Sequence, residues 1–287
     1  MDIKSIGLVL KNIEEINTDT IEKVWDILSA QGIKVYLEDK YSEYIRLPIV
    51  YTSKEELYEK ADVILSLGGD GTLIAAARNC AKYNKPIMGI NLGHLGFLSE
   101  MEMDELQGLN KLLSGEYTID ERMMITCEFT DTEDCHHSYN CLNDIIISRG
   151  SYPRMIDINL EINNEMVENY TADGLIIATP TGSTAYSLAA GGPVVEPNVK
   201  VMLVTPICPH SLNNRAILVS DERVLEITVN EKYNKKVFVS PDGQDSIEIK
   251  GNIMVKKSPY TTKLIRINDK SFYSILNNKI SERGAKK

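Results

Sequence analysis

The sequence of 287 residues has few of the features that anchor a protein in a membrane or tie it together with disulfides. Its five cysteines are scattered and include no Cys-x-x-Cys pair; they are Cys80, Cys127, Cys135, Cys141 and Cys208. An odd, dispersed set of this kind predicts reduced thiols. No stretch approaches the roughly 18 consecutive apolar residues of a transmembrane helix, and the first residues lack a signal-peptide layout. We therefore expect a cytoplasmic protein.

Positive charge is also in short supply. The chain carries 31 Lys and Arg against 41 Asp and Glu, which gives a net charge of −10. Proteins that bind nucleic acids or anionic membranes present basic surfaces, so we expect neither kind of partner. The remaining composition, 43% hydrophobic and 25% charged, supplies enough apolar material for a folded core. The length is that of one large or two modest domains.

The first third of the sequence alternates between strand-like and helix-like patterns. Apolar runs that predict buried strands occupy 3–10, 33–37, 63–67 and 87–90. Helical periodicity predicts helices over 18–31 and 73–81, and Ser53 and Glu56 have the spacing of a capping box. Strands that alternate with helices through short connections predict a mostly parallel, Rossmann-like sheet covered by helices. We assign this α/β domain to residues 1–120.

Beyond residue 120, strands follow strands. Residues 157–162 alternate between apolar and polar side chains, and Asn163-Asn164 then turns the chain into a second strand, 166–170, which predicts a hairpin. Further strands are predicted over 145–148, 175–178, 224–229, 253–257 and 263–267. We assign an all-β sandwich domain to residues 121–265, with one short helix over 184–190. The tail, 266–287, is amphipathic, and its sequence leaves open whether it packs back on the first domain.

A glycine-rich turn, Gly68-Gly69-Asp70-Gly71-Thr72, joins a predicted buried strand to a predicted helix. Glycines let a ligand approach backbone N–H groups, and a helix N-terminus attracts phosphate. The turn is neither a Walker A loop nor the Gly-x-Gly-x-x-Gly fingerprint. A carboxylate beside a phosphate site is explicable if Asp70 accepts a proton from a substrate hydroxyl or helps to hold a metal ion. The alternative is a plain strand-to-helix turn in which Asp70 caps the helix.

The segment Asp173 to Pro193 is rich in small residues and hydroxyls, with Tyr186 as its single ring. Such a surface suits close backbone contact with a nucleotide, and Ser183 or Thr184 is placed to cap the short helix that follows. Because residues 155–199 contain no Lys or Arg, phosphates bound here would depend on backbone N–H groups, hydroxyls and a metal. A tightly packed domain junction would have a similar composition.

Two shorter segments carry weaker signals. Asn143-Asp144, at the start of a predicted strand, could contact ribose hydroxyls or form an ordinary Asx turn. Cys135-His136-His137 and Cys141 invite comparison with zinc ligands, but a structural zinc needs four, and the sequence supplies no matched pair. His94 could touch a phosphate or satisfy backbone groups, and we leave it outside the catalytic residues.

Taken together, these motifs resemble the NAD kinase family, also called the ATP–NAD kinase family, in its bacterial form. Four segments carry the resemblance in the family's order and spacing: Gly68 to Thr72, Gly93 to Leu98, Asn143-Asp144, and Asp173 to Pro193. The first also occurs in lipid kinases and, in related form, in phosphofructokinases, whereas the Thr-Pro-Thr-Gly-Ser-Thr-Ala-Tyr-Ser block is much more specific. At Asp144 many members have Glu, so the carboxylate is kept and its reach is one methylene shorter.

The resemblance implies phosphorylation of the 2′-hydroxyl of NAD's adenosine ribose, which gives NADP. ATP is the implied donor, used with a divalent metal, Mg²⁺ or Mn²⁺, and no protein-only metal site is expected. Members are usually homo-oligomers, so we expect a dimer or tetramer. Asp70 is the implied general base, and the implied phosphate turn is Gly68, Gly69, Gly71 and Thr72. The implied NAD contacts are Asp70, Gly71, Phe97, Asn143, Asp144, Arg154, Asp173, Thr184, Ala185, Tyr186, Ser187, Leu188, Ala189 and Gln244.

Two other functions are compatible with parts of the sequence. A kinase for a lipid or sugar hydroxyl would share the glycine turn, although a lipid kinase should also present an amphipathic membrane surface, and no such stretch is evident. A non-catalytic NAD or NADP sensor would not need Asp70, so the intact turn argues against it. Use of NADH, use of polyphosphate, and feedback by NADP or NADPH are left open.

Overall fold

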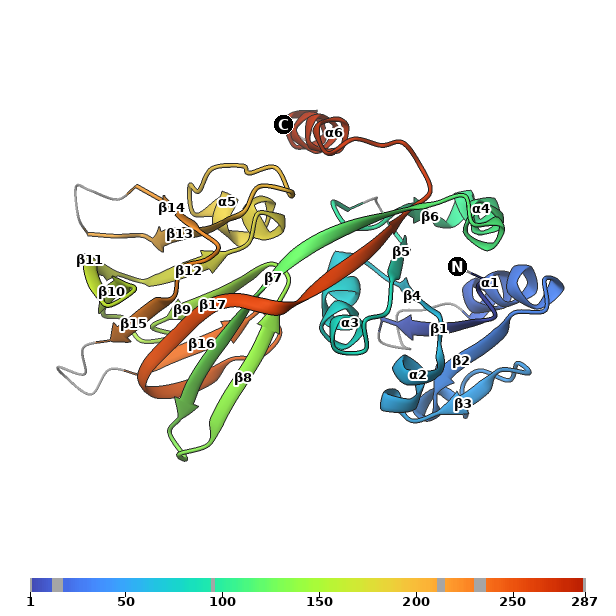
Figure 1. Cartoon of the computed structure of the whole chain (residues 1–287), viewed down its shortest axis with the longest axis horizontal. Helices are drawn as coiled ribbons and strands as arrows, with labels where there is room; N and C mark the ends of the chain where they lie inside the picture. The colour runs from blue at the N-terminus through green and yellow to red at the C-terminus, as the bar shows by residue number, and fades with distance from the viewer. Residues whose placement is uncertain (1, 12–17, 94–95, 211–214, 230–235, 286–287) are drawn as a thin grey trace. The chain divides into compact units, whose positions relative to one another are not determined.

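The computed structural model describes the chain except residues 1, 12–17, 94–95, 211–214, 230–235 and 286–287 (Figure 1). The chain divides into two compact units. One, the α/β unit, comprises Met1–Glu121 and Thr262–Lys287, and the other, the strand unit, comprises Arg122–Thr261. The chain passes between them in two long strands, β7 (Thr118–Asp131) and β17 (Ile247–Arg266).

The α/β unit is built on a parallel sheet in the order β3-β2-β1-β4-β5-β6. Its strands are β1 (Ser5–Leu10), β2 (Lys34–Glu38), β3 (Val50–Thr52), β4 (Val63–Leu67), β5 (Ile87–Asn91) and β6 (Met101–Glu102). The end of β17 also pairs with β5, where Leu264 lies beside Ile87 in parallel register. Every residue of β4 and β5 is buried, as expected for central parallel strands that are covered on both faces.

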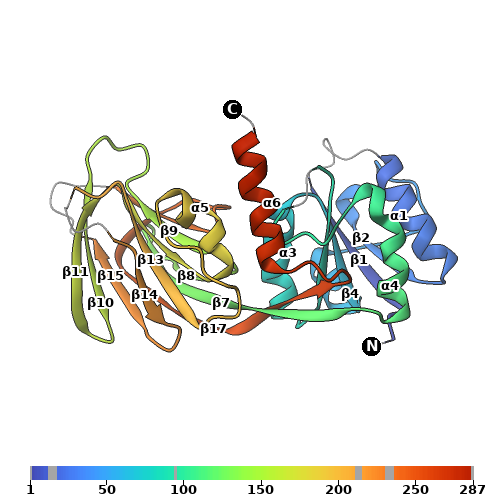
Figure 2. The same cartoon turned by 90° about the horizontal axis from the view of Figure 1, so that it is seen from above.

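Helices cover both faces of this sheet. These α-helices are α1 (Thr18–Ala30), α2 (Lys54–Lys60), α3 (Asp70–Lys82) and α4 (Leu109–Ser114), with the 3₁₀ segments η2 (Asp39–Tyr41) and η3 (Met103–Gly108). The tail adds a further helix, α6 (Phe272–Ala285), to the same unit. Helices α1 and α4 lie on one face, where they share a core with the sheet (Figures 1 and 2). On the other face, Gly7 of β1 lies so close to Leu57 and Ala61 that a Cβ atom would clash with Leu57. The predicted α/β architecture is confirmed.

The strand unit contains two antiparallel sheets that share β17. One sheet has the order β11-β10-β15-β17-β7-β8, and the other has the order β14-β13-β12-β9-β16-β17. The remaining bounds are β8 (His136–Cys141), β9 (Asp144–Ser148), β10 (Ile156–Ile162), β11 (Glu165–Ala172), β12 (Gly174–Ala178), β13 (Val201–Ile207), β14 (Ile217–Ser220), β15 (Leu225–Val229) and β16 (Val237–Pro241). Buried side chains from both sheets form one core, so the prediction of a strand-rich second half is confirmed.

Local turn chemistry fits the sequence at two points. Ser53 is the N-cap of α2, and its hydroxyl accepts the N–H of Glu56 at 3.2 Å. Asn163 and Asn164 both have positive φ, 50° and 64°, which is the backbone of a tight hairpin turn between β10 and β11. Among the described residues, no helix is long and apolar enough to cross a membrane.

Three elements differ from the sequence-based expectation. Helix α3 begins at Asp70 rather than at 73, so Asp70 lies in its first turn. The helix expected over 184–190 is two short pieces, η4 (Thr181–Thr184) and α5 (Tyr186–Ala189). Ser183 does not cap it, because its hydroxyl is bonded to both backbone groups of Val195. The strands expected over 253–257 and 263–267 belong to the single strand β17, which continues through Pro259, a residue that strands accept where no ladder N–H is needed.

Candidate active site

Among the residues that the structure describes, nothing packs against two glycines of the turn between β4 and α3. In this part of the chain, a Cβ atom at Gly69 or Gly71 would meet nothing within 4 Å, and neither residue has positive φ. Gly68 is different, because a Cβ there would lie 2.3 Å from Oγ1 of Thr72. Open space above two glycines at the N-terminus of a 13-residue helix is what a phosphate group requires, since the ligand approaches the backbone where a side chain would stand.

The carboxylate of Asp70 is oriented by the segment that follows β5. Its Oδ2 accepts the N–H of Phe97 at 2.8 Å. Its Oδ1 accepts the N–H of Ser99 at 3.2 Å and the hydroxyl of Ser99 at 3.0 Å. The N–H of Leu98 contributes a longer contact, at 3.3 Å to Oδ1. Asp70 does not cap its own helix, whose N-cap is Gly69. The alternative role as a helix cap is therefore wrong, because the side chain points to a different segment.

Gly96 allows this approach. A Cβ atom at Gly96 would lie 2.1 Å from Oδ1 of Asp70, well inside contact distance. Phe97, which was expected to line the NAD site, is half-buried and contacts Asp70 through its backbone. His94 lies outside the described residues. The structure thus brings together Asp70, the glycine turn and Phe97 within the α/β unit.

In the strand unit, Asp242 organises the backbone around Asn143. Its carboxylate accepts three consecutive N–H groups, from Leu142 at 3.1 Å, Asn143 at 2.8 Å and Asp144 at 3.1 Å. Asp242 has a positive φ of 52° in the turn after β16. The sequence analysis missed this residue, although the Asp-Gly pair immediately before Gln244 is a turn signal that could have indicated it.

Within the described ranges, the side chains of Asn143 and Asp144 have no hydrogen-bond partner. Asp144 is 4% exposed, and its carboxylate receives no hydrogen bond from the residues that the structure describes. Burial, and secondarily the nearby Asp242 carboxylate, raises the pKa of Asp144 to about 7. Oδ1 of Asn143 is buried and is also unpartnered among the described residues. Because buried polar atoms are nearly always paired, these two residues are candidates for ligand contact.

The loop after β12 is fastened to the same segment. Thr179 donates its hydroxyl to the carbonyl of Leu142 at 2.6 Å and its N–H to the carbonyl of Asn143 at 2.8 Å. A Cβ at Gly182 would lie 2.1 Å from that Asn143 carbonyl, so only glycine fits. The structure therefore brings the predicted pair Asn143-Asp144 beside the middle of the small-residue segment. Thr184 belongs to that segment.

The remaining residues of that segment differ in accessibility. Thr184, Ala185 and Leu188 are half-buried, and Tyr186 and Ala189 are exposed. Ser187 is buried, and its hydroxyl lies 2.9 Å from Oγ1 of Thr205. That hydroxyl therefore helps to hold α5 to β13, while the neighbouring side chains remain accessible to a ligand.

Asp173 forms an ion pair with an arginine that the sequence analysis did not single out. Nε of Arg149 lies 2.6 Å from Oδ1 of Asp173, and the guanidinium also donates to the carbonyl of Tyr152. Arg154, a predicted contact, is exposed. Gln244 is exposed in the turn after β16, where its N–H donates to the carbonyl of Pro241 at 3.2 Å.

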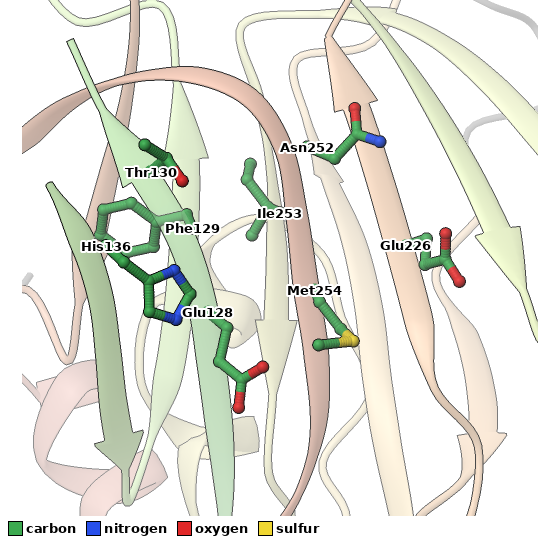
Figure 3. Close-up of a pocket in the computed structure, with 8 residues that line it drawn as sticks. All are labelled: Glu128, Phe129, Thr130, His136, Glu226, Asn252, Ile253 and Met254. Carbon is green, nitrogen blue, oxygen red and sulfur yellow. The ribbon is translucent and has the colours of Figure 1, made fainter. Parts of the chain in front are cut away.

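The Cys135-His136-His137 stretch shows no metal-binding arrangement. His137 lies 2.7 Å from Asp131 and stacks on Phe129. His136 lines a groove of about 320 Å³ on β7, β8, β15 and β17, together with Glu128, Glu226 and their neighbours (Figure 3). Among the described residues, no group of three or more His, Cys, Asp or Glu side chains is placed to hold a metal ion. None of the predicted site residues lines this groove.

Family models match both halves of the chain. Residues 6–117 match the ATP-NAD kinase N-terminal domain, and residues 142–267 match the ATP-NAD kinase C-terminal domain. Proteins named NAD kinase align with almost the whole sequence. Those of Thermoanaerobacter sp. (strain X514) and Caldanaerobacter subterraneus subsp. tengcongensis are each 39% identical over 284 residues, which cover 98% of this chain and 100% of each relative.

Solved structures of similar proteins share the fold. Yeast NADH kinase, crystallised with NADH, superposes with a TM-score of 0.87 at 25% identity and covers 98% of this chain and 88% of its own. An NAD kinase from Archaeoglobus fulgidus, in complex with ATP, gives a TM-score of 0.77 at 26% identity and covers 96% and 98%. Both domains, the glycine turn and the small-residue segment are thus accounted for together: the chain belongs to the ATP–NAD kinase family.

Proposed function

We propose that this chain transfers the terminal phosphoryl group of ATP to the 2′-hydroxyl of the adenosine ribose of NAD, giving NADP. One observation carries the proposal: a carboxylate, Asp70, is oriented by three backbone N–H groups and a hydroxyl inside a glycine turn that is open to phosphate. Phosphoryl transfer depends mainly on positioning and charge stabilisation, with a carboxylate to receive the hydroxyl proton.

Asp70 is the general base in this proposal. The 2′-oxygen forms a bond to the terminal phosphorus of ATP, the bond from that phosphorus to the bridging oxygen breaks, and ADP leaves with the electron pair. The hydroxyl proton passes to Asp70. Oδ2 suits this role better than Oδ1, because it accepts one short hydrogen bond, from Phe97, and a long one from Leu98 at 3.4 Å. Oδ1 accepts both groups of Ser99 as well as the N–H of Leu98. A carboxylate oxygen with one short bond keeps a lone pair for the proton.

Phosphate binding falls to the backbone. The open faces of Gly69 and Gly71 let phosphate oxygens approach the first turn of α3, whose dipole favours negative charge. Thr72 is half-buried in the same turn. This arrangement needs no cluster of Lys and Arg, which is consistent with the acidic composition.

In this proposal, the segments around Asn143 and Thr184 bind NAD. The unpartnered Oδ1 of Asn143 and the carboxylate of Asp144 are acceptors suited to ribose hydroxyls. The accessible side chains of Thr184, Ala185 and Tyr186 offer a hydroxyl, a small surface and a ring for stacking. Further NAD contacts proposed from the family are Gly71, Phe97, Arg154, Asp173, Ser187, Leu188, Ala189 and Gln244.

The residues present fit a metal ion that arrives with ATP. In the described part of the chain, no group of three or more Asp, Glu, His or Cys side chains is placed to hold a metal ion. Mg²⁺ is commonly bound through substrate phosphates, waters and one or two carboxylates, so such a cage is not required. When bound, Mg²⁺ or Mn²⁺ would neutralise charge on the phosphates. Asp70 lies in the glycine turn, so its carboxylate is placed to contribute a ligand to that ion.

We also propose that the protein is cytoplasmic and homo-oligomeric. All five cysteines are free thiols, which suits a reducing compartment. Leu218 on β14, Val194 and Val199 expose apolar side chains, and exposed apolar surface is what subunits bury. Light scattering should give a mass two or four times the 32.2 kDa of one chain. A monomer at micromolar concentration would contradict the oligomer.

An acceptor panel tests the reaction. The full chain is incubated with Mg²⁺, ATP labelled at its terminal phosphate, and NAD, a diacylglycerol in vesicles or a hexose. We expect label on NAD alone, at the 2′-position by phosphorus NMR. Label on the lipid or sugar instead would favour the other kinase class, and NAD binding without transfer would favour a sensor.

A further inference from the structure

A buried ion pair lies directly behind the segment that orients Asp70. We propose that Arg266 and Glu100 are positioning residues for the phosphoryl transfer, acting through residues 97–99 on the carboxylate of Asp70. The inference rests on the proposed role of Asp70 as the base. All the residues involved belong to the α/β unit, Arg266 being the last residue of β17.

Glu100 joins the segment after β5 to the end of β17. It is 4% exposed, and its Oε1 accepts the N–H groups of Ile267 at 3.1 Å and Asn268 at 2.8 Å. Its Oε2 accepts Nη1 of Arg266 at 3.2 Å. Its own N–H donates to the carbonyl of Gly89 in β5 at 2.9 Å. Glu100 is therefore fixed from both sides, and it is the residue next to Ser99.

Arg266 reaches further along the same segment. Its side chain is 14% exposed, and Nη1 donates to the carbonyl of Leu98 at 3.1 Å as well as to Glu100. Nε donates to Asp120 at 3.3 Å. The peptide groups around Leu98 are thus bonded on two sides: the carbonyl of Leu98 to Arg266, and the N–H groups of Leu98 and Ser99 to Asp70.

This arrangement has a chemical consequence. A catalytic group must be held within about 0.5 Å of its productive position, and loops hold side chains less precisely than helices and strands do. The segment 97–99 is not in a regular element. Arg266 and Glu100 tie it to strands β17 and β5, so the donors to Asp70 gain the rigidity of the sheet. Without this tie, the carboxylate would still be present but less well aligned.

The variant Arg266→Lys tests the proposal, because lysine keeps the charge but cannot reproduce the fixed fork of donors that reaches Leu98, Glu100 and Asp120. We expect kcat to fall about tenfold or more, with KM for NAD and ATP within about twofold of the parent enzyme. Asp120→Asn, which weakens the contact to Nε and leaves both Nη1 contacts in place, should give a smaller fall in kcat and keeps the test valid if Arg266→Lys folds poorly. Lys257→Met, which removes an ion pair with the buried Asp221 in the strand unit, is the matched control and should leave kcat unchanged.

A double-mutant cycle separates positioning from general stabilisation. If Arg266 acts through Asp70, Arg266→Lys should have little further effect on the residual single-turnover rate of Asp70→Asn. An equal fold-loss in both backgrounds, or a change in KM with kcat unaltered, would overturn the proposal. The two ideas fail separately: a fully active Asp70→Asn enzyme would refute the base, whereas an inactive Asp70→Asn enzyme with a normal Arg266→Lys enzyme would refute the positioning role alone.

Discussion

The N–H of Phe97 donates a hydrogen bond of 2.8 Å to Oδ2 of Asp70, although the two residues lie 27 positions apart. One belongs to the first turn of α3 and the other to the segment after β5. Because β4 and β5 are adjacent parallel strands, their carboxyl ends meet at one edge of the sheet. The sheet topology thus places the glycine turn beside the segment that aims its carboxylate.

This contact predicts a specific effect of enlarging Gly96. A methyl group there would meet Oδ1 of Asp70 at 2.1 Å, so Gly96→Ala must displace the carboxylate. We expect kcat to fall about tenfold or more, since small misplacements of a reacting group are costly. Gly93→Ala is the matched control, because its nearest neighbour would be 3.9 Å away and activity should stay within about twofold. Equal activity in the two variants would contradict the geometry.

Gly71 should show opposite effects on stability and on activity. Gly71→Ala meets no neighbour and lies inside α3, so it should raise the free energy of unfolding by roughly 0.5–1 kcal/mol. The same methyl group would occupy the proposed phosphate space, and KM for ATP should rise about tenfold or more. Denaturant unfolding and initial rates measure the two effects.

Gly68→Ala serves as the comparison for that prediction. Its methyl group would lie 2.3 Å from Oγ1 of Thr72, so this variant should lose roughly 1–3 kcal/mol of stability. If Gly71→Ala keeps a normal KM for ATP, phosphate does not bind over that glycine.

Asp144 makes stability depend on pH. Its folded-state pKa of about 7 lies above its ordinary value of 3.8. The favourable contribution of Asp144 to the free energy of unfolding is therefore fully present below about pH 3.8, and it is lost as the pH rises through about 7. Asp144→Asn, which mimics the neutral form, should therefore be more stable than the parent at pH 8, by roughly 2–4 kcal/mol, and close to it near pH 4. Urea unfolding at the two pH values checks this. The same variant should bind NAD less well, and a pH-independent difference in stability would show that the carboxylate is not the cause.

Removal of divalent metal should abolish productive ATP binding. The described residues offer no preformed metal cage, so metal-free ATP would bring uncompensated charge to a chain of net charge −10. We expect chelation with EDTA to raise the dissociation constant for ATP at least about tenfold. Calorimetry with and without Mg²⁺ measures this. Equal affinities would show that the phosphate site lies elsewhere.

Much of the fold follows from local sequence properties. Hydrophobic periodicity predicts α1 and the buried strands, Ser53 predicts the start of α2, and Asn163-Asn164 predicts the hairpin turn. These features depend on neighbours in the chain. The start of α3 was misplaced by three residues, because helix-breaking glycines concealed that Asp70 already has helical geometry.

The site could be predicted only where its residues form motifs. Asp70, Phe97 and Asn143 stand in recognisable segments, but Asp242 and Arg266 do not. Asp242 is 99 residues from Asn143, and Arg266 is 168 residues from Leu98, and both contacts exist only because the sheets bring distant segments together. Arg149 likewise gains its meaning from Asp173: Arg149 directly follows β9, Asp173 directly precedes β12, and these two strands pair. No local pattern distinguishes Arg149 or Arg266 from ordinary surface charges.

The most direct test of the account compares NADP formation by the parent enzyme and by Asp70→Asn. Each purified protein is incubated with NAD, ATP and Mg²⁺, and NADP is detected with an NADP-specific dehydrogenase. Asp104→Asn, an exposed acid in the same unit, is the control. The account predicts NADP from the parent and the control, and a loss of at least about 10²-fold in kcat for a folded Asp70→Asn protein. Near-normal turnover by Asp70→Asn, or no NADP from the folded parent, would contradict it.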